Sequence, residues 1–286
     1  MHTLDITQKG VHIEIPSEWD DCSPEQVHFI LKNAFLVMDG SLSIADFRIK
    51  VFAHLTGLKI GLKDRIYQRL GLNKLINEKI FLFSQELCDW IFSKNEDDNY
   101  ELNFNSVLNY FPVLEGKFYG LDHLLADISL SEFKSALSLI NQYFDSKTNE
   151  EDSETYLNYF IATLYRPKNS QGVKLPLSEY ILEPDNFKKI AIWKKQIIAI
   201  WFSYCVKCLQ EEDVVIDGMD VNFSVLFPKP NGARNNRQKV NLGWNGVILD
   251  IAESGVFGDA EHTGKTLLYD VLIYLLKKHQ DQPIQK

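Results

Sequence analysis

Residues 190–206 read IAIWKKQIIAIWFSYCV, the most apolar stretch of the chain. Lys194 and Lys195 interrupt it, and it is shorter than the roughly 20 apolar residues that a membrane-spanning helix needs. A helix that is apolar around most of its circumference has to be buried, either inside the fold or against a partner. We therefore expect a long core helix over about 186–210, capped by Asp185.

Helix-start signals recur on the N-terminal side of this stretch. Ser23 is a good cap, Pro24 suits the first helical position, and Gln26 completes a capping box. Ser43, with Asp46 three residues later, marks the next helix start. Hydrophobic spacing predicts further helices over 63–70, 74–92, 131–144, 156–164, 243–254 and 266–278.

Short strands are expected at a few places between the helices. VHIEI at 11–15 alternates apolar and polar residues, and Pro16 ends the pattern. Residues 100–104 form a second candidate, and a hairpin is expected near 214–227 around Asp217-Gly218. The sequence thus predicts a mainly α, helical globular protein with small β elements, α+β at its edges.

The acidic run Glu150-Glu151-Asp152 is the best candidate for a domain boundary. It would separate an N-terminal helical domain with a short N-terminal strand, 1–148, from a C-terminal helical domain with the hairpin, 149–286. The alternative is one single domain, because no segment has the length and composition of a linker.

Composition narrows the class of protein. Hydrophobic residues make up 45% of the 286, which is enough to form a folded core. The net charge of -9 disfavours binding to nucleic acid or to anionic membranes by the protein as a whole. The first ten residues show no signal-peptide pattern, and four cysteines are too few for a disulfide scaffold. We expect a soluble, cytoplasmic protein.

Gly264-Lys265-Thr266 matches the end of a phosphate-binding loop. Five residues separate it from Gly258, where the motif has four, and the preceding segment is typical of a helix rather than a strand. We interpret these residues as a helix N-terminus with Thr263 as the cap.

Cys205 and Cys208 form a CxxC pair inside the apolar stretch. A redox pair sits where a strand enters a helix, and a zinc site needs further cysteines or a histidine pair. The seven histidines include no HxxxH or HxxH spacing. We therefore expect buried structural cysteines and neither a metal nor a cofactor, although a catalytic site built from scattered residues remains an open alternative.

Two groups of residues are candidates for partner binding. The loop 229–239 carries four basic residues and no acid, so it could contact phosphate or an acidic partner, or remain a solvated loop. It lacks the aromatic residues that stack on bases. Aromatic side chains of the long helix are candidate interface anchors. The candidate residues are Lys229, Arg234, Arg237, Lys239, Trp193 and Trp201.

Segments with characteristic hydrophobic and turn residues are spread along most of the chain. They are IPSEWDDCSPEQVHFI (15–30), GSLSIADFR (40–48), FYGLD (118–122), LSEF (130–133), IATLYRP (161–167) and WNGVILDIAESG (244–255), followed by TLLYDVLIYLL (266–276). Together they resemble a group of uncharacterised prophage and phage-like tail-region proteins of the assembly type, in which no catalytic signature is known.

The resemblance implies a non-enzymatic structural or assembly-chaperone-like protein of a phage-type or prophage tail module. Such a protein would bind other module proteins, in the cytoplasm or incorporated into a phage-type particle. The alternative is an adaptor that binds nucleic acid or an acidic partner through the loop 229–239. The sequence leaves the oligomeric state open, and also whether the long helix is internal or interfacial.

Overall fold

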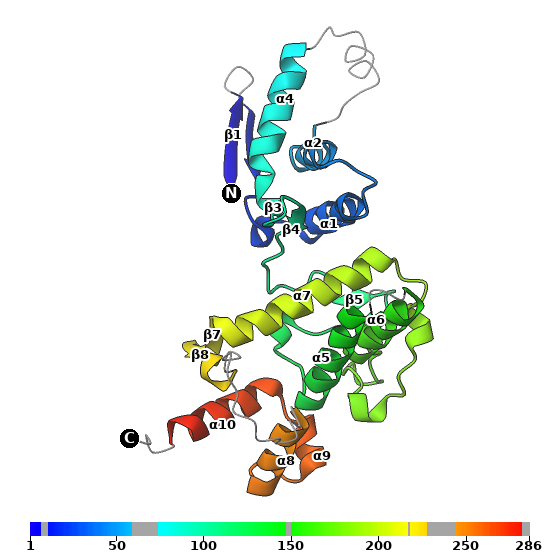
Figure 1. Ribbon diagram of the computed structural model, residues 1–286, viewed down its shortest axis with the longest axis vertical. Helices are drawn as coiled ribbons and strands as arrows, with labels where there is room; N and C mark the ends of the chain where they lie inside the picture. The colour runs from blue at the N-terminus through cyan, green and yellow to red at the C-terminus, as the bar shows by residue number, and fades with distance from the viewer. Residues whose placement is uncertain (7–10, 59–73, 147–149, 217, 228–243, 282–286) are drawn as a thin grey trace. The chain divides into compact units, whose positions relative to one another are not determined.

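The computed structural model describes residues 1–6, 11–58, 74–146, 150–216, 218–227 and 244–281 (Figure 1). These residues form two compact units, Met1–Ser106 and Val107–Lys286. Helices dominate both units, and the strands in the described residues form two-stranded antiparallel sheets. The prediction of a mainly α protein with small β elements is confirmed.

The N-terminal unit begins with a hairpin. Strand β1, His2–Ile6, pairs antiparallel with β2, Val11–Ile15, so that His2 faces Ile15 and Ile6 faces Val11. The strand expected at 11–15 is confirmed, and its partner was not foreseen. Ile15 is fully buried, which ties the end of the hairpin to the core of the unit.

The first two helices begin where their capping residues predict. In α1, Pro24–Met38, Ser23 and Gln26 form the expected capping box. In α2, Ile44–Leu55, the Ser43 hydroxyl accepts the backbone N–H of Asp46. The two helices pack together and bury Val27, Ile30, Leu31, Ala34, Phe47, Val51 and Leu55.

The helix predicted over 74–92 is too long. Helix α4 spans Lys74–Leu87, and after a short 3₁₀ turn the chain forms β3, Phe92–Lys94, which pairs with β4, Tyr100–Leu102. Phe92 packs edge-on against Phe47 at 5.2 Å, and the Asn95 side chain accepts two backbone N–H groups of the turn. These tertiary and turn contacts outweigh the helical pattern. The strand expected at 100–104 is confirmed at 100–102, and the helix expected at 63–70 lies outside the described residues.

The C-terminal unit is built on three long helices. Helix α5, Leu130–Asp145, packs against α6, Glu150–Leu164, more extensively than any other pair of elements, and α7, Ile192–Glu211, packs against α6 (Figure 1). The other elements are β5 Val113–Leu114, β6 Phe118–Tyr119, β7 Asp213–Ile216, β8 Met219–Asn222, α8 Trp244–Ser254, α9 Ala260–Lys265 and α10 Leu268–Gln280. The hairpin expected near 214–227 is the β7–β8 pair.

The domain boundary differs from the one expected at 148/149. That position lies between α5 and α6, whose close packing places both helices in one unit. Acidic residues are common in solvent-exposed loops, but they also stabilise a helix N-terminus. Glu150 is the first residue of α6, so the acidic run begins a helix rather than separating two domains. The units instead divide between Ser106 and Val107.

Helix α7 begins later than predicted. Residues Pro184–Phe187 form a 3₁₀ turn, because the fully buried ring of Phe187 packs on Phe118 with centroids 4.7 Å apart. Ala191 is extended (φ -53°, ψ 130°), so the α-helix starts at Ile192. Among the described residues, no helix combines the length and the apolar content needed to cross a membrane.

Candidate partner-binding groove

The four basic candidates, Lys229, Arg234, Arg237 and Lys239, lie outside the described residues. The two tryptophans are described. Trp201 is only 3% exposed, and its indole N–H donates to the carbonyl of Val107 at 2.9 Å. Trp193 is half-buried and packs against Phe111 at 6.0 Å. Trp201 is therefore a core residue in its unit rather than an interface anchor.

The CxxC pair lies in the buried part of α7. Cys205 and Cys208 are unpaired and buried on α7. Burial raises the pKa of the Cys205 thiol and raises that of Cys208 to about 11, so both thiols stay protonated at neutral pH. The expectation that both cysteines are buried is confirmed.

The Gly264-Lys265-Thr266 segment is a helix C-terminus, not the helix N-terminus that we expected. Helix α9 is capped by Asp259, whose carboxylate accepts the backbone N–H of His262. Thr263 is fully buried in the last turn, and Thr266 is the C-cap. The six-residue α9 was missed because such a short helix carries little periodicity.

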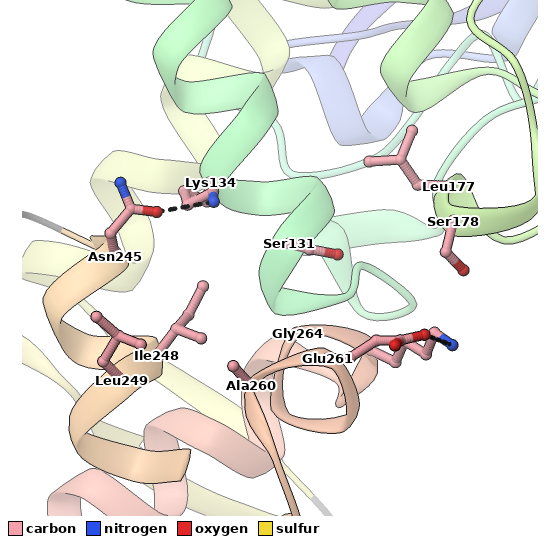
Figure 2. Close-up of a pocket in the computed structure, with 11 residues that line it drawn as sticks. Ser131, Lys134, Leu177, Ser178, Asn245, Ile248, Leu249, Ala260, Glu261 and Gly264 are labelled. Carbon is pink, nitrogen blue, oxygen red and sulfur yellow. Dashed lines mark hydrogen bonds and ion pairs between the residues drawn. The ribbon is translucent and has the colours of Figure 1, made fainter. Parts of the chain in front are cut away.

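A groove on the C-terminal unit is the candidate site. Two adjoining cavities of about 690 Å³ and 580 Å³ share Lys134, Leu177 and Asn245 in their walls. The walls come from α5, α6, α8, α9 and the segment 177–182. We call these two cavities together the Lys134 groove, and Figure 2 shows the residues around the larger one.

Helix α5 supplies one wall through its polar face. Its first turn is fixed by a capping box, in which the Ser129 hydroxyl and the Glu132 carboxylate each accept the other residue's backbone N–H. Ser131, Ser135 and Ser138 are spaced by four and three residues, so they share a helix face with Lys134 and line the groove.

Helix α8 forms the facing wall. Trp244, its first residue, packs edge-on against Phe133 of α5 with ring centroids 5.2 Å apart. Lys134 on α5 and Asn245 on α8 follow these two aromatic residues. They are also joined, because Lys134 Nζ donates to Asn245 Oδ1 at 2.9 Å (Figure 2). The apolar contact and the hydrogen bond together hold α8 across the groove from α5.

Helix α9 closes one end of the groove. Gly264 lies against α5, where an added Cβ would meet Ser131 Cβ at 3.5 Å. The chain after α9 is bound to the start of α5 by two backbone hydrogen bonds of 2.9 Å, Leu130 N–H to Thr266 and Leu268 N–H to Ile128. The position of α9 against α5 is therefore fixed by the backbone as well as by side chains.

The charges of the groove do not balance. Lys265 pairs with Glu261 at 2.7 Å, an interaction that raises the pKa of the lysine and lowers that of the glutamate. Lys134 forms no ion pair among the described residues, and it donates its hydrogen bond to the neutral amide of Asn245. The walls therefore carry a net positive charge, although the whole chain has a net charge of -9.

Aliphatic side chains line both cavities. In the larger cavity, Leu249 of α8 is 55% exposed beside the buried Ile248, opposite Leu177. In the smaller cavity, Leu139 and Leu182 are half-buried and accompany Tyr159 and Tyr180. Burial raises the pKa of the Tyr180 hydroxyl, so it remains a neutral hydrogen-bonding group.

A buried ion pair supports the groove from within the unit. Arg166, 1% exposed, donates to the carboxylate of Glu132 on α5 and to the carbonyl of Thr163 at the end of α6. Its Nε donates to the carbonyl of Leu175 at 2.6 Å, two residues before Leu177. One guanidinium thus fixes three of the elements whose side chains line the groove.

The described residues of the lining include serine hydroxyls but neither histidine nor cysteine, and the raised pKa of Lys265 keeps that amine protonated. Across the described ranges, no group of three His, Cys, Asp or Glu side chains is placed to hold a metal ion. The groove can therefore offer apolar contacts, hydroxyl groups and one uncompensated cation to a ligand.

Sequence reasoning missed the groove, although one signal was visible. Lys134 is the one basic residue in α5, and no acidic residue stands three or four positions from it on the helix. The serine spacing around it marks a polar face. Its partner Asn245 is 111 residues away, and no local pattern connects the two.

Comparison of the chain with models of protein families, with curated proteins and with solved structures finds no match.

Proposed function

We propose that this chain is a non-enzymatic, structural or assembly-chaperone-like protein of a phage-type or prophage tail module. It binds other proteins of that module, in the cytoplasm or in a phage-type particle. The observation that carries the binding role is the Lys134 groove, whose aliphatic side chains stand partly open to solvent beside hydroxyl and amide groups. The assignment to a tail module comes from the sequence resemblance.

The groove has the composition of a protein-binding surface. Apolar contacts supply affinity, and a few fixed polar groups around them supply orientation. Leu249 is an exposed leucine in a concave wall, where a partner's side chain would cover it. The walls belong to helices tied together by Trp244 and Arg166, so the surface is formed before a partner arrives, which limits the entropy lost on binding.

The first experiment is affinity purification of the tagged full-length chain from cells that express the complete module, followed by mass spectrometry. We expect tail-region proteins of the same module to co-purify. If no module protein co-purifies, even after chemical cross-linking, the proposal is wrong.

A matched pair of variants then tests whether the groove is responsible. Leu249→Asp places a charge in the groove wall, whereas Val256→Asp makes the same change at an equally exposed residue, 53% against 55%, that does not line either cavity. Leu249→Asp should abolish the interaction, and Val256→Asp should keep it. Equal binding by both variants would exclude the groove as the binding surface.

A further inference from the structure

We infer that the Lys134 groove recognises an aliphatic segment of a partner protein that carries one carboxylate, and that this carboxylate pairs with Lys134. The inference rests on the proposed function, since it specifies the chemistry of the partner at the same groove. Three features of the groove lead to it: the uncompensated charge of Lys134, the donors that its ammonium group retains, and the aliphatic residues in both cavities.

The charge of Lys134 is placed where a ligand would meet it. Lys134 lines both cavities, so its ammonium group lies where they adjoin rather than at an outer edge. The other cation of the lining, Lys265, is already paired with Glu261. A carboxylate in the groove would therefore find one unpaired cation among the described lining residues.

The geometry of the ammonium group leaves room for this pairing. An ammonium group has three donors, and the Asn245 amide oxygen takes one of them at 2.9 Å. That hydrogen bond also holds the side chain across the groove, toward α8 (Figure 2). A ligand carboxylate would meet a cation whose position is already fixed.

The leucines around Lys134 favour a ligand segment in which the carboxylate has aliphatic neighbours. Leu249 lines the larger cavity, Leu139 and Leu182 line the smaller one, and Leu177 and Lys134 line both. A segment with leucine-like residues before and after an aspartate or glutamate would place its carboxylate at Lys134 and an aliphatic side chain in each cavity. Nucleic acid matches the groove less well, because its regularly spaced phosphates need several cations and the described lining offers one unpaired cation.

The test uses short fluorescein-labelled peptides in which leucines flank a single central glutamate, and identical peptides with glutamine in its place. Binding to the full-length protein is followed by fluorescence anisotropy at low and at raised salt. We expect the glutamate peptides to bind about fivefold more tightly, with the difference shrinking as salt is added.

Variants at two lysines assign the preference to a residue. Lys134→Met should remove the preference for glutamate, and Lys134→Arg should keep most of it because the charge is retained. Lys207→Met, at an exposed lysine of α7 outside both cavities, is the matched control and should behave like the unaltered protein. Thermal melting of each variant shows that it is folded.

Several outcomes would overturn the inference. Equal affinity for glutamate and glutamine peptides would do so, as would a preference that survives Lys134→Met, or no binding by any of the peptides. Binding of a labelled single-stranded oligonucleotide that is lost in Lys134→Met would assign the groove to nucleic acid instead. If module proteins still co-purify in any of these cases, the inference fails while the proposed function stands.

Discussion

The indole of Trp244 packs edge-on against the ring of Phe133, with centroids 5.2 Å apart and planes at 86°. Phe133 is buried in the face of α5 that points into the unit, and Trp244 is the first residue of α8. The two residues that follow them, Lys134 and Asn245, are joined by a hydrogen bond in the groove wall. The position of the polar pair therefore depends on the aromatic pair beside it.

We predict a measurable coupling between Phe133 and Trp244. Phe133→Leu and Trp244→Leu each remove the edge-to-face contact, so the double variant should lose less stability than the sum of the single variants. The difference should be about 0.5–1.5 kcal/mol, the usual size for such aromatic pairs. Urea unfolding of the four proteins measures it. The ring of Phe257 packs on Tyr274 instead, so the losses of stability caused by Phe257→Leu and Phe133→Leu should add.

The buried pair of Arg166 and Glu132 should respond strongly to the removal of one partner. Arg166→Met leaves a buried carboxylate and two carbonyls without their donor, and Glu132→Leu leaves a buried guanidinium without its counter-ion. Each single change should cost about 3–5 kcal/mol of unfolding free energy. The double change should cost less than the two single changes together, and simple additivity in denaturant titrations would contradict this reading.

Local signals predicted the parts of the fold that depend on neighbouring residues. The capping box of Ser23 and Gln26 and the turn that leads from β7 to β8 are such cases. Features set by distant contacts were missed. Helix α7 starts at Ile192 because Phe187 packs on Phe118, and the chain leaves the helical conformation after α4 because Phe92 packs on Phe47. Hydrophobic spacing alone does not contain these contacts.

The candidate site was less predictable than the fold, for the same reason. Trp201 was a candidate anchor because it is aromatic, yet aromatic side chains fill cores as readily as interfaces, and its indole N–H donates to the carbonyl of Val107 inside the unit. The lysine and serines of the α5 face were visible in the sequence. Their function as a groove wall depends on α8 and α9, which the chain brings to α5 from more than a hundred residues away.

Two fully buried threonines should respond oppositely to replacement by valine. The Thr263 hydroxyl has no hydrogen-bond partner within the described part of the chain, whereas the Thr163 hydroxyl donates to the carbonyl of Tyr159 at 2.9 Å. Thr263→Val removes an unsatisfied polar atom and should leave stability unchanged or raise it by up to about 1 kcal/mol. Thr163→Val should lower stability by about 1 kcal/mol. Equal effects in thermal or urea unfolding would show that the Thr263 hydroxyl is bonded after all.

The buried cysteines should make the protein less stable in alkali. Burial raises the pKa of Cys22 and of Cys88 to about 12, and that of Cys208 to about 11. In the unfolded chain these thiols ionise near their ordinary pKa of about 8.5. Because the pKa is raised on folding, their contribution is complete below about pH 8.5 and is lost as the pH rises toward the folded-state values.

Each such thiol should lower the free energy of unfolding by up to about 1.4 kcal/mol per pH unit within that window. Urea unfolding between neutral pH and about pH 10 measures the slope. Cys88→Ala should reduce the slope by the contribution of one thiol. It should also lower stability at neutral pH, where the thiol is not ionised in either state and only the lost packing of a fully buried side chain counts. An unchanged slope would mean that Cys88 ionises at a similar pH in the folded and unfolded states, which its complete burial makes unfavourable.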